Sequence, residues 1–333
     1  MGKLRNKELK NLLSCIRVDP RVIVPPMPGY DAGVHLLGDK CVVVATDPCV
    51  GVPDEWFGWL LIYFAASDVA LFGAKPEFCT INLLAPLASK PDVFQSIMQQ
   101  ACGAADELGI AIVRGHTGTY DGLSKPVGVC TAYGTVAKEK MITPGNAESG
   151  DLIVCTKAVG FETLINFSLT HKALAKRLFG IQEAEQLMKS VKMESCVNEA
   201  LALAEIRGVH ALHDATEGGL TNALNEVAEA SSLGFRIEYE ELPITTEMNA
   251  LQKEFGLSLD QVLSTSSTGM IIAAVKKQAK MIVEETLQRR GIPASFIGTF
   301  TKNKTRVLKW VSGSMLFPHV ADDPYGNILS SKE

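Results

Sequence analysis

The sequence has no excess of basic residues and no long apolar run. Its 333 residues contain 32 Lys and Arg against 37 Asp and Glu, for a net charge of -5. Nucleic-acid-binding proteins usually carry a clustered basic excess, so nucleic acid is not an expected partner. The most apolar stretch, residues 56–72, includes Asp68 and is shorter than the about 20 residues of a membrane span. The N-terminal MGKLRNKELKNLLSCI lacks the apolar core of a signal peptide, so no membrane partner is expected.

Closely spaced cysteine pairs are also lacking. The eight cysteines stand singly, none in a C-x-x-C motif, and several lie in apolar, strand-like runs. Such cysteines behave as small core hydrophobes in a reducing compartment. This pattern predicts a cytoplasmic protein.

The two common nucleotide-binding loops, GxxxxGK[ST] and GxGxxG, are absent. The composition is otherwise that of a folded chain, with 47% hydrophobic and 21% charged residues. At about 150 residues per domain, the length suggests two domains, each able to bury a core.

Hydrophobic periodicity predicts strands and helices mixed in both halves of the chain. An amphipathic helix is expected over residues 4–16, before a Pro-rich loop at 25–29. Strands are expected over residues 32–37, 41–46, 78–84, 110–114, 127–136, 152–156, 235–239 and 270–275, and further helices over 56–72, 92–108, 183–206 and 219–230. This mixture indicates an α/β or α+β fold class.

The segment TPGNAESGD, residues 143–151, is polar and rich in turn-forming residues. It is the best candidate for a domain boundary. We predict an N-terminal domain over residues 1–143 and a C-terminal domain over residues 151–333.

Two aspartates flank the hairpin predicted around Gly38-Asp39-Lys40. If the turn is centred on Asp39, Asp31 and Asp47 face each other at its open end. Opposed residues have Cβ atoms about 4.5–5.5 Å apart, where like charges repel, so the pair needs a shared proton or a cation. Mg²⁺ is the usual cation where carboxylates meet substrate phosphates. In a different register, both aspartates would be solvated loop residues.

Asp68 is the only charged residue in the stretch FAASDVALF, residues 64–72. Burying a carboxylate without a partner is costly. Asp68 therefore either serves a binding site or is satisfied by a helix cap or an internal hydrogen bond.

The motif GHTGT, residues 115–119, directly follows the strand expected over 110–114. Glycines and hydroxyls at a strand end can present backbone N–H groups to a phosphate, which makes Gly115 and Thr117 candidates for nucleotide binding. Loops of this composition are also common without any ligand.

The motif HDATEGGL, residues 213–220, opens the helix expected over 219–230. The pair Gly218-Gly219 would let an anion approach the helix N-terminus, although the motif also fits an ordinary strand–turn–helix corner. His213 and Glu217 are candidates for a general base by their position alone.

Taken together and in this order, these stretches resemble the aminoimidazole ribonucleotide (AIR) synthase superfamily. It includes thiamine monophosphate kinase, selenophosphate synthetase and the hydrogenase expression/formation protein, and the helix motif is most similar to this last branch. The resemblance is carried by YDAGVHLLGDKCVVVATDP, FAASDVALFGAKP, RGHTGT, PGNAESGDLIV, HDATEGGLTNALNEVAEAS and STSSTGMIIAAV, between Tyr30 and Val275.

The resemblance implies a two-domain AIR-synthase-like architecture with a mixed sheet in the C-terminal domain. It also implies a homodimer whose N-terminal domains pair through their hairpin strands, with ATP near that interface and the Pro-rich loop closing over it. Asp31, Asp47 and Asp68 would hold Mg²⁺ and the phosphates of ATP. The further candidates for nucleotide binding are Gly115, Thr117, Asp214, Gly218 and Gly219.

These observations predict an ATP- and Mg²⁺-dependent enzyme that phosphorylates an oxygen, hydroxyl or amide, of a small-molecule acceptor. The alternative is a hydrogenase-maturation-type protein that acts as a nucleotide-binding partner in metallocofactor assembly. A scaffold without nucleotide is a third possibility. The hydrogenase-maturation enzyme modifies its own C-terminal cysteine, whereas the last cysteine of this sequence is Cys196, so we expect a different acceptor here.

Overall fold

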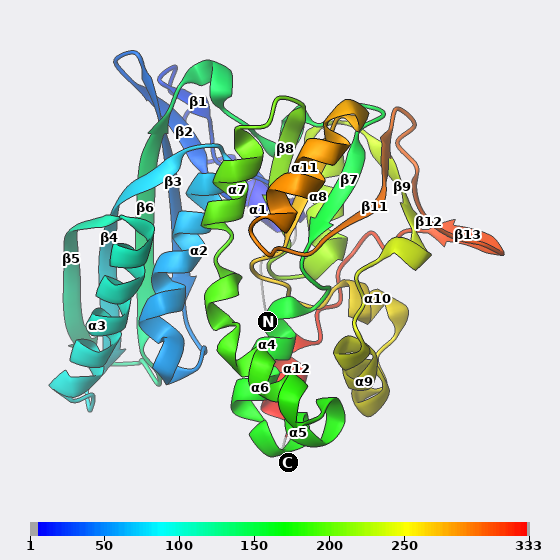
Figure 1. Cartoon of the computed structure of the whole chain (residues 1–333). Coiled ribbons are helices and arrows are strands. Elements are labelled where there is room, and N and C mark those ends of the chain that lie inside the picture. The colour runs from blue at the N-terminus through cyan, green and yellow to red at the C-terminus, as the bar shows by residue number, and fades with distance from the viewer. Residues whose placement is uncertain (1–5, 332–333) are drawn as a thin grey trace.

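The computed structural model describes residues 6–331 and contains two mixed β-sheets with helices packed around them (Figure 1). The first sheet has the strand order β1-β2-β3-β6-β4-β5. Its strands are β1 (Val22–Val24), β2 (Gly33–Leu37), β3 (Lys40–Cys49), β4 (Lys75–Pro86), β5 (Ala111–Tyr120) and β6 (Val127–Val136). All neighbours are antiparallel except β4 and β5, which helix α3 (Pro91–Leu108) connects in parallel.

The second sheet has the order β13-β12-β9-β11-β7-β10-β8, and only β12 and β9 run parallel. Its strands are β7 (Leu152–Thr156), β8 (Val209–Asp214), β9 (Gly234–Glu238), β10 (Ile271–Val275), β11 (Ala294–Thr301), β12 (Arg306–Trp310) and β13 (Gly313–Leu316). The prediction of mixed strands and helices in both halves is confirmed. Along the sequence, the strands of the first sheet precede residues 143–151 and those of the second sheet follow them. The division into two domains at this segment stays a prediction.

Helix α2 (Phe57–Leu71) lies between the first sheet and α7 (Val197–Ala204) of the second half (Figure 1). It is apolar on all sides because both faces are covered, and 13 of its 15 residues are buried. A Cβ on Gly58 would lie 2.1 Å from the carbonyl oxygen of Ile97, so this glycine permits the close approach of α3. Asp68 is thus held inside the most buried helix of the chain.

Of the remaining helices, α1 precedes the first sheet and the others belong to the second half of the chain. They are α1 (Asn6–Leu13), α4 (Phe161–Thr170), α5 (Lys172–Phe179), α6 (Ile181–Lys189), α8 (Gly219–Ala230), α9 (Thr246–Phe255), α10 (Leu259–Leu263), α11 (Lys280–Gln288) and α12 (Tyr325–Ser330). Short 3₁₀ turns are η1 (Asp54–Trp56), η2 (Lys138–Lys140), η3 (Pro144–Asn146), η4 (Val191–Glu194), η5 (Tyr239–Glu241) and η6 (Lys277–Ala279). Leu4, part of the predicted first helix, lies outside the described residues. No helix that the structure describes has the length and apolar character to cross a membrane.

The predicted hairpin forms, but its register differs by one residue from the prediction. Leu37 pairs with Lys40 and Gly33 with Val44, so the turn has two residues and is not centred on Asp39. Gly38 has φ 64°, the left-handed conformation that two-residue hairpin turns require. Strand β2 also begins only at Gly33, so Asp31 does not stand opposite Asp47 in the ladder.

Two further segments differ from the prediction. The motif GHTGT lies inside β5, not after it, because its residues pair with β4 as far as Tyr120. The helix expected over residues 183–206 is divided into α6, η4 and α7. At the interruption the Ser190 hydroxyl donates to the carbonyl of Gln186, and the Ser195 hydroxyl accepts from the backbone of Val197. Such side-chain bonds compete with a continuous helix.

Candidate functional site

Four aspartates converge where the first sheet, helix α2 and strand β8 meet. Asp47 belongs to β3, Asp68 to α2 and Asp214 to the end of β8, while Asp31 precedes β2. Asp68 is only 6% exposed and shares a hydrogen bond with Asp47. Ligand atoms of Asp31, Asp214 and His213 all lie within 4.8 Å of one another. The structure therefore gathers the three aspartates predicted as metal ligands and adds Asp214 to them.

The aspartate cluster concentrates negative charge in the interior of the protein. Burial, followed by the carboxylates of Asp47, Asp214 and Asp31, raises the pKa of Asp68 well above its usual range. The hydrogen bond between Asp47 and Asp68 requires a proton on one of the two carboxyl groups. A hard divalent cation bound by carboxylate oxygens would take the place of that proton, so the donor set fits Mg²⁺.

His213 is 1% exposed; its Nδ1 is hydrogen-bonded, whereas its Nε2 approaches two carboxylates without a hydrogen bond among the described residues. Its Nδ1 donates to the carbonyl oxygen of Asp214 at 2.7 Å, and its Nε2 lies 3.1 Å from Glu226 Oε2 and 3.5 Å from Asp31 Oδ2. Burial lowers the pKa of His213, but Asp31, Asp214 and Glu226 outweigh this and raise it well above its usual value. The approach of Nε2 to both carboxylates fits a residue that positions Asp31, and the role of His213 as a general base stays a prediction.

The glycine pair that opens α8 faces other parts of the same chain. The backbone N–H of Gly218 donates to Asp323 Oδ2 at 3.0 Å, and the hydroxyl of Ser266 donates to the same oxygen at 2.6 Å. A Cβ on Gly219 would lie 2.3 Å from the carbonyl oxygen of Thr265. The position where a nucleotide phosphate was expected is therefore occupied by the chain's own carboxylate. Glu217, the second candidate base, is exposed beside this turn.

Gly115 and Thr117 lie far from the aspartate cluster of the same chain. In the first sheet, Asp47 pairs with Cys130, Cys130 with Ile81, and Ile81 with Gly115. Three strand spacings of about 4.8 Å separate Asp47 from Gly115, or roughly 14 Å. Both residues stand on the outer edge strand β5 and are exposed. Within one chain, the structure does not bring them to the predicted site.

Glu226 is a further site residue that the sequence motifs did not single out. Its side chain is only 13% exposed and meets His213. A Cβ on Gly29 would lie 3.1 Å from Glu226 Cβ, so the Pro-rich loop rests on this residue. A glutamate beside an apolar helical stripe is common on protein surfaces, and no sequence signal marks this one.

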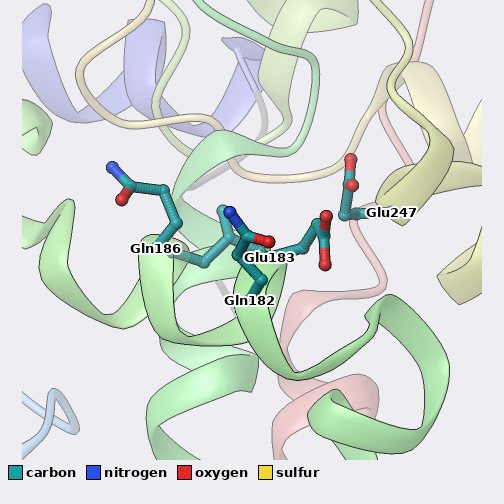
Figure 2. A pocket seen from close by; sticks show the side chains of 5 residues that line it. Gln182, Glu183, Gln186 and Glu247 are labelled. Atoms are coloured by element: carbon teal, nitrogen blue, oxygen red, sulfur yellow. The ribbon is translucent and has the colours of Figure 1, made fainter.

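A surface pocket lies away from all of these residues. Figure 2 shows Gln182, Glu183 and Gln186 of α6 beside Glu247 of α9, with Leu187 completing the lining. None of the predicted site residues lines this pocket, so it is not part of the candidate site.

Comparison with known families settles the relationship. The model for the N-terminal domain of AIR synthase related proteins matches residues 29–136, and the model for their C-terminal domain matches residues 148–311. The chain belongs to the AIR synthase related family. The resemblance inferred from the sequence motifs and the two-domain AIR-synthase-like fold are confirmed.

Individual relatives come from more than one branch of this family. A hydrogenase expression/formation protein of Methanocaldococcus jannaschii is 26% identical, over 88% of this chain and 86% of its own length. A selenide, water dikinase of Myxococcus xanthus is also 26% identical, over 91% and 92%. The structure of the hydrogenase maturation protein HypE in complex with ATP has a TM-score of 0.69 at 19% identity, covering 95% of this chain and 91% of that one.

Proposed function

We propose that the protein is an ATP- and Mg²⁺-dependent enzyme that transfers the γ-phosphoryl group of ATP to an oxygen of a small-molecule acceptor, either a hydroxyl or an amide. The convergence of Asp31, Asp47, Asp68 and Asp214 around one buried point carries this proposal. Phosphoryl transfer is mostly positioning and charge neutralisation, which a set of carboxylates around a metal ion can supply.

Each residue of the site has a role that its contacts support. Asp31, Asp47, Asp68 and Asp214 would hold Mg²⁺, which when bound neutralises the charge on the phosphates of ATP. Asp47 and Asp68 would lose their shared proton on metal binding. His213 holds Asp31 in place through Nε2 while its Nδ1 is tied to the backbone of Asp214.

The relatives support both forms of this function. The selenide, water dikinase relative is a phosphoryl-transfer enzyme by name, and the HypE neighbour binds ATP. The hydrogenase expression/formation relative supports the alternative, a nucleotide-binding partner in metallocofactor assembly. ATP turnover by the isolated protein would favour the enzyme, whereas nucleotide binding without turnover would favour the alternative.

We also infer a homodimer, but through a different part of the sheet than the hairpin. Both hairpin strands are already paired along their two edges, so they cannot add a partner's strand. Strand β5 has an open edge among the described residues and exposes Val113 (56%) and Tyr120 (42%). A partner chain at this edge would cover apolar surface and meet Gly115 and Thr117, which supports a nucleotide site shared between the subunits.

The cysteines support a cytoplasmic, reducing environment. All eight lie among the described residues and none forms a disulfide there. Six of them are buried, where they act as small apolar side chains.

Two measurements test the proposed function. ATP with Mg²⁺ should raise the melting temperature, and ATP with excess chelator should do so much less. A panel of small hydroxyl and amide compounds should then be screened for stimulated ADP release, with Asp47→Asn as the inactive control. If MgATP leaves the melting temperature unchanged, the protein is a scaffold without nucleotide and the proposal is wrong.

A further inference from the structure

A second group of buried acidic and amide side chains lies between α4, η4 and α12. Glu162 and Asn166 are one helical turn apart on α4, and Glu194 ends η4, which packs against α4. Tyr325 opens α12, and its hydroxyl accepts a hydrogen bond from Asn166 Nδ2 at 3.0 Å. Glu162 and Glu194 each act electrostatically on this same hydroxyl. All four residues therefore lie in one buried region of the molecule.

The oxygen atoms of this group are buried without enough donors. Glu194 and Asn166 are both 0% exposed. Three of these oxygens have no hydrogen-bond partner among the described residues. They are both carboxylate oxygens of Glu194 and the amide oxygen of Asn166. Buried carboxylates and amide oxygens are costly unless they are paired, hydrogen-bonded or bound to a metal.

Lys157 is the cation that acts on Glu194 among the described residues, and other groups already engage it. Lys157 lowers the pKa of Glu194, but its Nζ is 3.1 Å from Glu199 Oε1 and donates to the carbonyl oxygens of Met193 and Gly269. Glu162 receives two hydrogen bonds, from the hydroxyl and the backbone N–H of Thr268. Burial and the Glu162 carboxylate together raise the pKa of Glu194 well above its usual range. The hydrogen bonds of the lysine thus go to other groups, and two acids remain in the same buried region.

We propose that Glu162, Glu194 and Asn166 hold a hard metal cation in an enclosed site of their own, separate from the aspartate cluster. Carboxylate and amide carbonyl oxygens are the ligands that Na⁺, K⁺, Mg²⁺ and Ca²⁺ share. The unpartnered oxygens of Glu194 and Asn166 are the atoms left to coordinate it. The bound cation would stabilise the packing of α4 against η4 and the start of α12. Its binding does not require a bound nucleotide.

The test uses the full chain carrying Asp47→Asn, so that Mg²⁺ binding at the aspartate cluster does not mask the result. After removal of metals with chelator, melting temperatures are measured in choline chloride and then with MgCl₂, CaCl₂, KCl or NaCl at equal ionic strength. We expect at least one salt to raise the melting temperature above that in choline. The divalent and monovalent arms identify the class of cation.

Two substitutions with opposite effects link the shift to this site. Glu194→Gln should leave the melting temperature in choline close to that of the parent, because the amide matches the protonated acid in shape and charge, and should abolish the gain from the cation. Asn166→Asp adds a ligand charge and should enlarge that gain. Glu205→Gln, an exposed control close in sequence, should behave as the Asp47→Asn parent does.

Crystals of the Asp47→Asn protein soaked with Mn²⁺ or Tl⁺ give a direct readout even if Glu194→Gln fails to fold. An anomalous peak among Glu162, Glu194 and Asn166 is expected with one of the two probes. An ordered water alone at that position, together with no salt effect on the melting temperature, would overturn the proposal. Neither result depends on ATP, so failure here is distinguishable from failure of the proposed enzymatic function.

Discussion

The carboxyl groups of Asp47 and Asp68 share a hydrogen bond although one lies on strand β3 and the other inside helix α2. Two adjacent carboxyl groups can both ionise only when a cation neutralises them. This contact therefore links metal binding to the position of α2 against the first sheet. It also places the charge of the site in the interior, where solvent screens it least.

Replacing Asp47 by Asn should weaken MgATP binding at least tenfold, or about 1.4 kcal/mol, because one metal ligand loses its charge. Without metal the variant should be as stable as the parent or more so, since repulsion between Asp47 and Asp68 is relieved. Isothermal titration calorimetry with MgATP checks the affinity, and thermal melting checks the fold. Asp39→Asn, in the exposed turn of the same hairpin, is the matched control. If the Asp47→Asn variant binds MgATP as tightly as the parent, Asp47 is not part of the site.

The free energy of unfolding should fall as the pH rises from about 4.5 to about 7, because the stabilising contribution of protonated Glu162 is lost. Burial raises its pKa from 4.5 to about 7, against the hydrogen bonds from Thr268. The folded state thus holds the proton more tightly than the unfolded state, so the stabilisation is full below pH 4.5 and is lost through pH 7. A shift of this size corresponds to about 3 kcal/mol.

The measurement is the free energy of unfolding in denaturant across this pH range, in metal-free buffer. Glu162→Gln should lose this contribution to the pH dependence, whereas the exposed control Glu55→Gln should keep the slope of the parent. A Glu162→Gln variant with the parent's slope would show that another buried acid, such as Glu194, accounts for it.

The open edge strand predicts how the subunits associate. Light scattering should give a mass near twice 35.9 kDa for the parent protein. Val113→Lys places a charge on the exposed edge of β5 and should shift the mass toward that of one chain. Val311→Lys, at a 95% exposed position between β12 and β13, should leave the dimer intact. If the Val113→Lys variant is still a dimer, the interface does not lie at the edge of β5.

Part of the site could be predicted from the sequence because its signals are local. Asp68 is identifiable as an isolated acid in an apolar stretch that proves to be a fully covered helix. The proximity of Asp31 and Asp47 was inferred from a hairpin whose register was wrong by one residue. Both aspartates still act on Asp68, because Asp31 reaches the site from the loop before β2 and not from an opposed ladder position.

The rest depends on contacts between distant parts of the chain. Gly218 meets Asp323, which is 105 residues away, and no local pattern indicates that a carboxylate fills the helix N-terminus. Glu162 and Asn166 have helical spacing, but in the sequence such residues look like the polar face of an amphipathic helix. Only the packing of η4 and α12 against α4 shows that this face is buried.

The close contact at the start of α8 predicts a large effect of one methyl group. In Gly219→Ala, the added Cβ would collide with the carbonyl oxygen of Thr265, and the residue has φ 51°. Left-handed strain of roughly 1–2 kcal/mol and overpacking of about 1–3 kcal/mol should add together. Gly256→Ala is the matched control, with φ 62° and no atom within 4 Å of the added Cβ. Denaturant unfolding should show a clearly larger loss of unfolding free energy for Gly219→Ala than for Gly256→Ala. Equal losses would mean that the backbone at Thr265 shifts to make room for the added Cβ.

The last prediction concerns Cys196, a buried thiol near the aspartate cluster. Cys196 is 1% exposed, its backbone N–H donates to the hydroxyl of Ser67, and burial followed by nearby carboxylates raises the pKa of its thiol. A buried, protonated thiol is a poor nucleophile, so it should take no part in phosphoryl transfer. Cys196→Ser should therefore leave ATP hydrolysis and any acceptor-dependent turnover essentially unchanged, with a modest loss of stability. Intact-mass spectrometry after incubation with ATP and a carbamoyl-transfer partner should show no adduct on any cysteine. An ATP-dependent mass increase would mean that a thiol of this chain is the acceptor, and the small-molecule reading would have to be abandoned.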